Sequence, residues 1–441
     1  MAGENTMTTL NNNVKIIYGD KLKYLLPQGL WLYPNFEFKT AKKLGQAFYQ
    51  PIVLKHEHGF TYAASRFTGV STGSAPWAPS GTVVGVPYVT AAPGFIENAN
   101  IDGTQIFGRT LLDFESASRA ASSKASFVDS VGYVLENLDQ SAKRRLEIAM
   151  YLGQTPLAVA DTGTTTTNFI VTAATWAPGL WAGQEGAPIE VTSNTRTPVR
   201  GTSTISAINF TTRTITFAGA IASTVATDYL WFKSAASIGT AGGTGPAYPL
   251  TAANILQNEC VGLHTMLNAP TSVHGITCAT YSLWTPNSQD VGSANMNLEA
   301  VEDAAAKIIN RGGGGATYKL LMAPANYAKF INSLSGLRRL NKEDGSRYTI
   351  GAEDITIFAG GLKIVLVSWA YCMEGFAYLI NPDDFMRIGS TDLTYKVPGR
   401  GDDLFRLSDG AGSYEMQLYS LQAPACTALC RQCIFINIVP Q

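Results

Sequence analysis

Three cysteines near the end of the chain have a spacing that metal ligands often show. Cys426, Cys430 and Cys433 form a C-x3-C-x2-C cluster, which could bind a metal ion or an iron–sulfur centre. No fourth cysteine or histidine lies nearby in the sequence, whereas a structural site needs four ligands. Residues 433–439 instead have the pattern of a strand in which cysteine is a small buried hydrophobe. Six cysteines in 441 residues are also too sparse for a disulfide framework.

Two histidines and a run of glycines are the next candidates. His56 and His58 would point to one face of a strand and could share a metal ion, but only His264 and His274 remain in the chain to complete the site. The glycines at 312–315 could surround a phosphate. They follow a predicted helix and precede a predicted strand, however, which reverses the order of a phosphate loop. We therefore predict the end of a helix and a loop here.

Paired carboxylates occur at Asp383 and Asp384 and again at Asp402 and Asp403. Adjacent residues on a strand point to opposite faces, so neither pair alone forms the acid and base of a glycosidase. Solvated turns explain both pairs better. No Gly-x-Ser-x-Gly or His-Glu-x-x-His pattern is present. We predict no catalytic, cofactor-binding or metal-ligating residues.

The overall charge limits the partners of the chain. Lys and Arg number 32 and Asp and Glu 33, so the net charge is -1 and no general field attracts the molecule to nucleic acid or to an anionic membrane. Any contact with DNA must be local. The densest basic group, Arg338, Arg339 and Lys342, could meet a phosphate or an acidic neighbour, although a solvated loop is the ordinary interpretation. With 46% apolar residues, intrinsic disorder is excluded.

Targeting and membrane segments are not indicated. Residues 1–13 are polar and carry Glu4, so they lack the basic and apolar regions of a secretory signal. The longest apolar stretch, residues 361–380, is interrupted by Lys363 and Glu374 and is rich in β-branched and aromatic residues. It predicts buried strands and no membrane contact.

The first half of the chain predicts an extended part and a long helix. Residues 15–48 are broken by prolines and glycine and indicate an arm. Residues 48–64 and 82–107 flank a turn-prone tip at 71–80 and predict a long, protruding β-hairpin. From Glu115 to Tyr151 apolar residues recur every three or four positions without a proline, which predicts one helix of about 55 Å. Its polar face would carry Lys124, Asp129, Glu136, Lys143, Arg144 and Glu147.

The second half begins with a different composition. Residues 155–245 are rich in Thr, Ala, Ser and Gly, and they predict an inserted all-β domain that ends in a glycine-rich linker. Mixed α/β structure follows. Its predicted helices are 252–267, 298–310 (capped by Asn297) and 324–334, and its predicted strands are 318–322 and several between 348 and 378. Four final segments predict one antiparallel sheet: 393–397, 403–407, 414–421 and 433–439.

This order of elements resembles the major capsid protein of tailed bacteriophages, which has the Hong Kong 97-type fold. No single motif is diagnostic, but their order is. The segments that carry the resemblance are Ala99-Asn-Ile-Asp-Gly-Thr-Gln-Ile-Phe-Gly-Arg-Thr110, Ser141 to Gly153, Gly262-Leu-His-Thr-Met-Leu267, Asn310-Arg-Gly312 before Leu320 to Pro324, and Asp383-Asp-Phe-Met-Arg-Ile-Gly389. The resemblance covers nearly all of the chain except the β insertion, and it implies an α+β fold class.

The resemblance implies a domain organisation for this chain. It comprises residues 1–45 as an N-arm that lies across a neighbouring subunit, 46–110 as the E-loop and the start of the peripheral domain, 111–154 as the spine helix of the peripheral domain, 155–245 as an inserted β-rich domain, 246–390 as the axial domain with a connecting helix, and 391–441 as the closing sheet of the peripheral domain.

The resemblance also implies a function and its partners. The chain would be a structural subunit of an icosahedral tailed-phage head, without catalysis or a cofactor, that self-assembles into hexamers and pentamers enclosing double-stranded DNA. Its partners would be other copies of itself, a scaffolding protein, a portal, a cement protein in some heads, and the packaged DNA by weak contact. Assembly would take place in the host cytoplasm, and the product would be the virion shell.

Aromatic residues in the arm and hairpin are the anchors we expect between subunits: Tyr33, Phe36, Phe38, Phe48, Tyr49 and Trp77. Two other classes stay open. A cell-surface or surface-layer β-rich protein would fit the Thr, Ser and Ala content and the low charge, although no signal sequence is indicated. An enzyme such as a carbohydrate hydrolase would need distant carboxylates that no pattern identifies.

Overall fold

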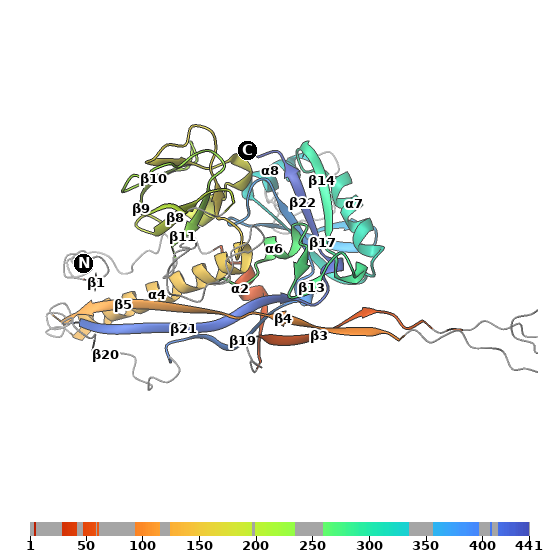
Figure 1. The fold of residues 1–441 in the computed structure, drawn as a ribbon, viewed down its shortest axis with the longest axis horizontal. Coiled ribbons are helices and arrows are strands. Elements are labelled where there is room, and N and C mark those ends of the chain that lie inside the picture. Colours follow the sequence, from red (N-terminus) through yellow and green to blue (C-terminus); the bar gives the residue numbers. More distant parts are fainter. Residues whose placement is uncertain are drawn as a thin grey trace, which may run out of the picture.

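The computed structural model describes residues 4–5, 29–41, 47–58, 60, 93–114, 124–195, 199–233, 259–334, 356–396, 406–407 and 413–440. Within these residues the protein is a mixture of helix and sheet, with three six-stranded sheets and two two-stranded ones. A long helix lies between the first sheet and the second, and the third sheet lies beside the second (Figure 1). The predicted α+β class is confirmed at this level.

The first sheet, which we call the long sheet, joins the two ends of the chain. Its strands are, in spatial order, β1 (Glu4–Asn5), β5 (Thr104–Asp113), β21 (Ser413–Cys426), β19 (Phe385–Thr394) and β2 (Glu37–Thr40), with β20 (Arg406–Leu407) also paired to β21. Strand β21 runs antiparallel to β5 from Ser413 opposite Asp113 to Gln422 opposite Thr104. Strands β1 and β2 add in parallel at the two edges. Segments from the predicted N-arm thus pair with strands of their own chain.

The predicted long helix is present as α4 (Lys124–Leu152). Its 29 residues correspond to about 43 Å, and residues 115–123 of the prediction lie outside the described part. Gly153 follows the helix, and its N–H donates to the carbonyl oxygen of Ala149. Two residues of the predicted polar face, Arg144 and Glu147, are buried. Both side chains bind other segments of the chain.

The insertion, by which we mean residues 155–233, forms the second sheet above α4 (Figure 1). Its strands are, in spatial order, β6 (Ala158–Val159), β11 (Tyr229–Phe232), β8 (Pro188–Thr192), β9 (Val199–Asn209), β10 (Thr214–Phe217) and β7 (Asn168–Ile170). Two short helical segments, η1 (Ala173–Thr175) and α5 (Pro178–Trp181), face the rest of the chain. The β-rich character predicted for these residues is confirmed.

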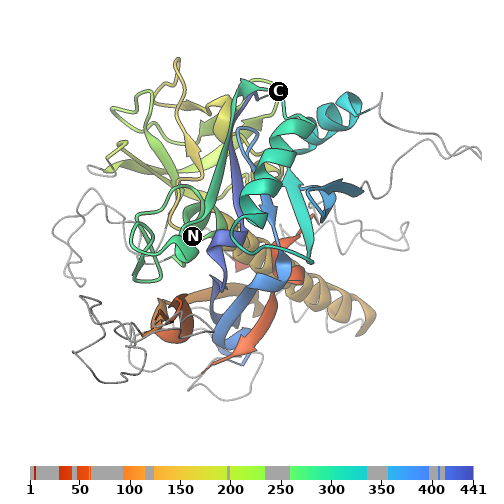
Figure 2. The same ribbon diagram turned by 90° about the vertical axis from the view of Figure 1, so that its right-hand side faces the viewer.

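The third sheet contains the mixed α/β residues. Its strands are, in spatial order, β14 (Asn287–Ala294), β22 (Cys433–Ile438), β18 (Ala377–Ile380), β15 (Thr317–Met322), β17 (Leu362–Ser368) and β16 (Thr356–Ala359). Helices α7 (Leu298–Ile309) and α8 (Pro324–Ser333) cover it, with α7 toward the viewer in Figure 2. Both were predicted, including the Asn297 cap, whose side chain accepts the N–H of Ala300 at 2.9 Å.

Two predictions fail in this region. Residues 433–439 were placed with 414–421 in one antiparallel sheet, but β22 pairs with β14 and β18 in the third sheet. Only six residues, 427–432, connect β21 to β22, and alternation along a strand does not tell which sheet receives it. Of the helix predicted at 252–267, residues 252–258 lie outside the described part, residues 259–262 are not helical, and residues 263–267 form α6 (Leu263–Leu267). Gly262 directly precedes α6. Its N–H donates to the carbonyl oxygen of Gly153, so it is not part of a helical hydrogen-bond series.

The predicted hairpin is present at its base. Strands β3 (Phe48–Lys55) and β4 (Phe95–Ile101) pair antiparallel, with Phe48 opposite Ile101 and Val53 opposite Ile96. These two strands lead away from the long sheet, beneath the turn between β12 (Ser272–Val273) and β13 (Ile276–Thr277) (Figure 1). The predicted tip at 71–80 lies outside the described residues.

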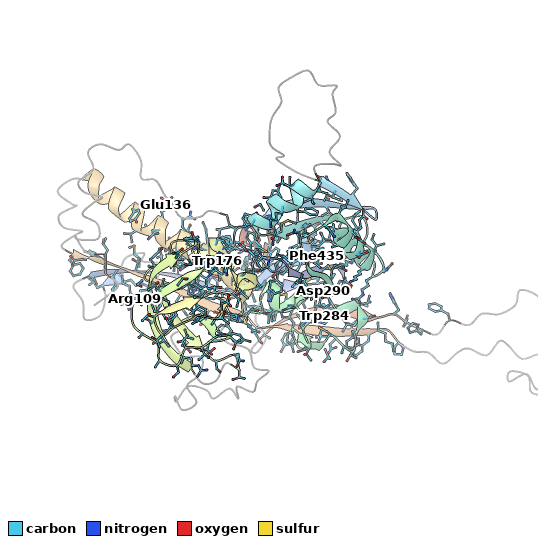
Figure 3. All side chains as sticks on the ribbon, turned by 90° about the horizontal axis from the view of Figure 1, so that it is seen from above. Arg109, Glu136, Trp176, Trp284, Asp290 and Phe435 are labelled. Atoms are coloured by element: carbon cyan, nitrogen blue, oxygen red, sulfur yellow. The ribbon has the colours of Figure 1, made fainter. Side chains whose placement is uncertain are left out.

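One hydrophobic core is common to the arm, α4, the insertion and the third sheet. It contains Leu32 from the arm, Leu146 from α4, Trp181 and Leu230 from the insertion, and Trp369 from the loop after β17. Trp176 lies where the insertion meets the body (Figure 3), and its carbonyl oxygen accepts the N–H of Glu374. Residues 155–233 are therefore packed against the rest of the chain and are not a separate appendage.

Candidate functional site

The cysteines have the environment of buried hydrophobes. All six are buried and free, and burial raises the pKa of each thiol that lay in the predicted cluster, for Cys433 to about 12. Metal binding requires thiolates, which such burial disfavours. In the described part of the chain, no group of three or more His, Cys, Asp or Glu side chains could hold a metal ion.

The histidines and glycines are also placed without a common site. Strand β3 ends at Lys55, so His56 and His58 follow it as exposed residues and are not paired on a strand face as predicted. The glycines at 312–315 lie between α7 and β15, as expected for a helix end and a loop. Gly312 and Gly315 have φ angles of 83° and 77°, in the left-handed region that glycine adopts without strain.

The first aspartate pair is a turn. Asp384 ends the 3-10 segment η4 (Pro382–Asp384), and its carboxylate accepts from the side-chain amides of Asn381 at 3.1 Å and Gln432 at 2.9 Å. Burial raises the pKa of Asp384, and the bond from Asn381 acts against the rise. The residue therefore connects η4 to the segment that precedes β22. The pair at 402–403 and the basic group at 338–342 lie outside the described residues.

Glu147 binds the arm segment, by which we mean residues 29–41. Its carboxylate accepts the main-chain N–H groups of Trp31 at 2.8 Å, Leu32 at 2.8 Å and Tyr33 at 2.7 Å, and the indole N–H of Trp369 at 3.2 Å. These main-chain donors are the free N–H groups at the start of the short helix α2 (Leu32–Asn35). Burial raises the pKa of Glu147, and the four donors act against that rise.

Arg144 binds the insertion in the same manner, with the opposite charge. Its guanidinium donates to the carbonyl oxygens of Gly179 at 3.1 Å and Leu180 at 3.0 Å, and also to that of Ala182. These carbonyls end α5, where a helix favours a cation. The next residue, Arg145, lies over the ring of Phe232 with its guanidinium carbon 3.4 Å from the centroid. Burial lowers the pKa of Arg145 to about 10.

Arg387 fixes the arm segment from the long sheet. Its guanidinium donates to the carbonyl oxygen of Phe36 at 2.9 Å and to the carboxylate of Asp392 at 3.0 Å, and it lies 4.3 Å from the ring centroid of Tyr33. Residues 383–389 were singled out in the sequence only because they resemble a segment of tailed-phage major capsid proteins. Neither Arg387 nor Glu147 was predicted to hold the arm, because a charged residue in a strand or helix gives no sign of its distant partner.

A buried chain of hydroxyl and imidazole groups connects α4 to the third sheet. Tyr151 and Tyr378 hydroxyls lie 3.1 Å apart, and the Tyr378 hydroxyl lies 2.7 Å from Nδ1 of His264. The Asn268 amide nitrogen lies 3.2 Å from Nε2 of His264. An amide nitrogen only donates, so Nε2 accepts and Nδ1 carries the proton. Burial lowers the pKa of His264 to about 4.

Two of the expected intersubunit anchors are internal. Phe36 and Phe48 are each 1% exposed within the subunit, so neither is available to a neighbour. Phe36 stacks on Phe385 with ring centroids 5.0 Å apart. Tyr33 and Phe38 are partly buried beside Arg387, and Trp77 lies outside the described residues. Tyr49, on β3, is exposed as expected.

The hairpin carries the surface that we regard as the candidate site. Val53 and Ile96 are 61% and 63% exposed and lie directly opposite each other on β3 and β4. Tyr49, Phe95 and, beyond β3, Phe60 are exposed as well. Two-stranded hairpins are marginally stable alone, and exposed apolar groups of this kind mark protein contacts. Alternation along β3 could have predicted Val53, but the sequence does not show which face the body covers.

Comparison with solved structures finds that the fold of this chain is similar to those of capsid proteins. No protein-family model matches the chain, and neither does any curated protein. The capsid asymmetric unit of cyanophage A-1(L) is similar at 12% identity over 96% of this chain and 95% of the other, with a TM-score of 0.49. The capsid of a native GTA particle is similar at 7% identity over 98% and 99%, with a TM-score of 0.46. The capsid of Myoviridae phage XM1 is similar at 9% identity over 97% and 98%, with a TM-score of 0.41.

No described helix is both long enough and apolar enough to span a membrane.

Proposed function

We propose that this protein is a structural subunit of an icosahedral tailed-phage head, which self-assembles into hexamers and pentamers around double-stranded DNA. The single observation that carries the proposal is the hairpin of β3 and β4, whose opposite residues Val53 and Ile96 stay exposed in the isolated subunit. An apolar surface on a two-stranded extension is stabilised when a neighbouring copy covers it.

The organisation of the chain supports the same proposal. The resemblance of its segments to tailed-phage major capsid proteins assigns β3 and β4 to the E-loop, α4 to the spine helix, the long sheet to the peripheral domain and the third sheet to the axial domain. The placement of β22 in the third sheet requires one change, because the axial domain then takes its last strand from residues 433–438. The arm segment and β1 belong to their own subunit, so only the remainder of residues 1–45 is assigned to a neighbour. The proposal includes no catalytic residue and no cofactor.

The partners follow from the same assignment. A scaffolding protein, a portal and, in some heads, a cement protein would contact the shell, and the packaged DNA would contact it weakly because the net charge of the chain is -1. Assembly in the host cytoplasm and a final location in the virion are part of the proposal.

Expression of the chain alone, followed by negative-stain electron microscopy and light scattering, tests this function. We expect closed shells, capsomer-sized rings or polymerised tubes, since exposed apolar surface drives the association. Flat, open lattices would instead favour a surface-layer protein. A subunit that stays a monomer at high concentration and with every scaffold tried would contradict the proposal.

A further inference from the structure

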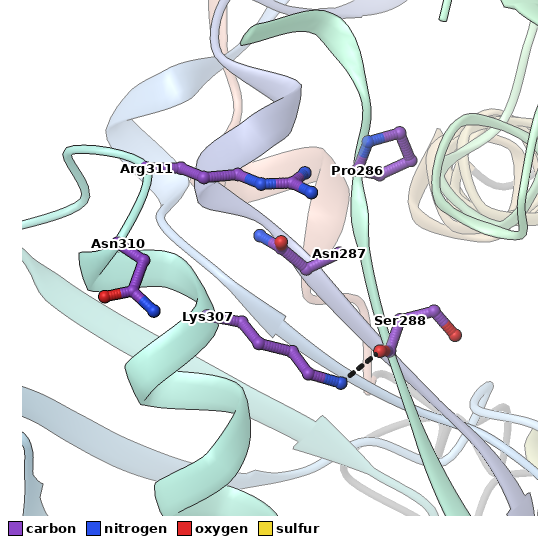
Figure 4. Close-up of a pocket in the computed structure, with 6 residues that line it drawn as sticks. All are labelled: Pro286, Asn287, Ser288, Lys307, Asn310 and Arg311. Atoms are coloured by element: carbon purple, nitrogen blue, oxygen red, sulfur yellow. Dashed lines mark hydrogen bonds between the residues drawn. The ribbon is translucent and has the colours of Figure 1, made fainter. Parts of the chain in front are cut away.

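A polar hollow lies at the end of α7, where this helix meets β14. Its volume is about 370 Å³, and it is lined by the six residues in Figure 4: Pro286, Asn287, Ser288, Lys307, Asn310 and Arg311. We call it the basic hollow, because two of these residues are cations and none is a carboxylate. Lys307 and Arg311 are one helical turn apart and extend toward β14 and the residues before it (Figure 4).

The two cations have only neutral hydrogen-bond acceptors among the described residues. Nζ of Lys307 donates to the carbonyl oxygen of Ser288 at 2.8 Å and to Oε1 of Gln289 at 2.7 Å. The Arg311 guanidinium donates to the carbonyl oxygen of Thr285 at 2.7 Å. Arg200, Arg387 and Arg431, in contrast, each have a carboxylate within 4 Å.

The basic hollow therefore retains donors for a further acceptor. A guanidinium has five N–H groups and an ammonium three, which exceeds the bonds formed here. The carboxylate on the adjoining strand, Asp290, accepts from the N–H of Gly292 and from the amide of Asn437. The ligand that suits two such cations is an oxyanion, for which carboxylate and phosphate are the ordinary sources.

The first half of α7 carries the matching charge. Glu299, Glu302 and Asp303, which we call the acidic patch, are exposed and form no ion pair with a described residue. The twelve residues of α7 correspond to about 18 Å, so one short helix presents both charges on the surface of the third sheet. Two copies of the chain can thus present complementary surfaces to each other.

We propose that the basic hollow of one subunit binds the carboxylates of the acidic patch on a second copy of this chain. This contact rests on the proposed function, since it is one of the contacts by which copies would assemble. Carboxylates are favoured over the phosphates of nucleic acid because the chain itself presents three of them on the same helix. The helix dipole alone would also favour acids at the start of α7 and cations at its end, and that role involves no second copy.

Charge reversal with mixing separates these possibilities. One variant carries Lys307→Glu and Arg311→Glu, and the other carries Glu299→Lys, Glu302→Lys and Asp303→Lys. Each variant alone brings like charges together, and we expect its assembly to fall about tenfold at low salt. In an equimolar mixture the acidic surfaces of one variant meet the basic surfaces of the other wherever the two alternate, so assembly into even-numbered rings returns, whereas five-membered rings cannot alternate. Lys329→Glu with Lys363→Glu, both exposed on the same part of the fold, is the matched control and assembles normally.

The remaining outcomes have separate meanings. Thermal unfolding of the unassembled subunits shows whether each variant still folds. If the variant with Lys307→Glu and Arg311→Glu does not fold, the neutral variant with Lys307→Gln and Arg311→Gln takes its place. Variants that lose stability without recovery in the mixture would leave only the dipole role and overturn the proposal. Unchanged assembly, or a loss confined to binding of a short DNA duplex, would overturn it too. Failure of the unmodified protein to assemble would instead contradict the proposed function.

Discussion

Arg144 and Glu147 lie three residues apart on α4, and each places its charge at the end of a different short helix, where that charge complements the helix dipole. Arg144 donates to the carbonyl oxygens at the end of α5, and Glu147 accepts the N–H groups at the start of α2. Both side chains are buried. One turn of α4 therefore holds the insertion and the arm segment together.

Glu147→Gln tests the attachment of the arm. The amide keeps one acceptor but turns an NH2 group toward donors that the carboxylate satisfied. We expect a loss of about 2–4 kcal/mol in the free energy of unfolding and faster hydrogen exchange at the amides of residues 31–33. Glu136→Gln, at an exposed position of α4, is the control. Unchanged exchange at residues 31–33 would contradict this role of Glu147.

Arg144→Met tests the attachment of the insertion. Methionine keeps much of the apolar length but leaves the carbonyl oxygens of Gly179 and Leu180 without a donor. The expected loss is about 2–4 kcal/mol in the free energy of unfolding, measured by denaturant titration. The control is Lys143→Met, since Lys143 forms an i,i+4 pair with Asp139 and does not contact α5. Equal effects at both positions would argue against the contact.

Two buried histidines should each lower the stability of the subunit on mild acidification. Burial lowers the pKa of both His264 and His274 from 6.5 to about 4. The unfolded chain therefore binds more protons than the folded one between these values, so stability present above pH 6.5 is lost as the pH falls toward 4. The loss is about 1.4 kcal/mol per pH unit for each histidine.

Replacement of these two histidines checks the pH effect. His264→Asn keeps a donor for Tyr378, and His274→Asn suits the positive φ of 52° at that position. We expect the double variant to show a flatter dependence of the unfolding free energy on pH between 4 and 6.5. The same exchange at the exposed residues His56 and His58 is the control. An unchanged slope in the double variant would place the proton uptake elsewhere.

Two glycine-to-alanine substitutions should have opposite signs. A Cβ at Gly132 in α4 meets nothing within 4 Å, so Gly132→Ala should stabilise the subunit by about 0.5–1 kcal/mol. A Cβ at Gly179 would lie 2.6 Å from both Cβ and the carbonyl oxygen of Ala370, and Gly179→Ala should cost about 1–3 kcal/mol. Thermal unfolding measures both. A neutral Gly179→Ala would show that the insertion can move away from residue 370.

Assembly should depend on the hairpin surface. Val53→Asp places a charge opposite Ile96 where we propose that a neighbour packs, so particles should be lost while the monomer keeps its stability. Val225→Asp is matched in residue type and in exposure, since Val225 is 48% exposed in the insertion. Electron microscopy and sedimentation of the two variants give the comparison. Equal assembly of both variants would remove Val53 from the interface.

Local sequence signals predicted the elements well and their contacts poorly. Periodicity and the absence of proline predicted α4, and Asn297 with the glycines at 312–315 predicted both ends of α7, because these signals act within a few residues. The partners of Arg144 and Glu147 lie far away in the sequence, and the same charges would have suited a solvated face. Strand β22 was predicted as a strand, but its sheet depends on tertiary contacts that no local pattern contains.

The short connection between β21 and β22 links the long sheet to the third sheet. The six residues 427–432 join a 14-residue strand of the long sheet to the third sheet. Hydrogen bonds fix this connection at both sides, from the N–H of Thr427 to Asp384 and from the Asn287 amide to Cys430. Tension along β21 therefore reaches the third sheet almost directly. Residues 381–384 join β18 to β19 beside it, so two short connections hold the long sheet and the third sheet together against being pulled apart.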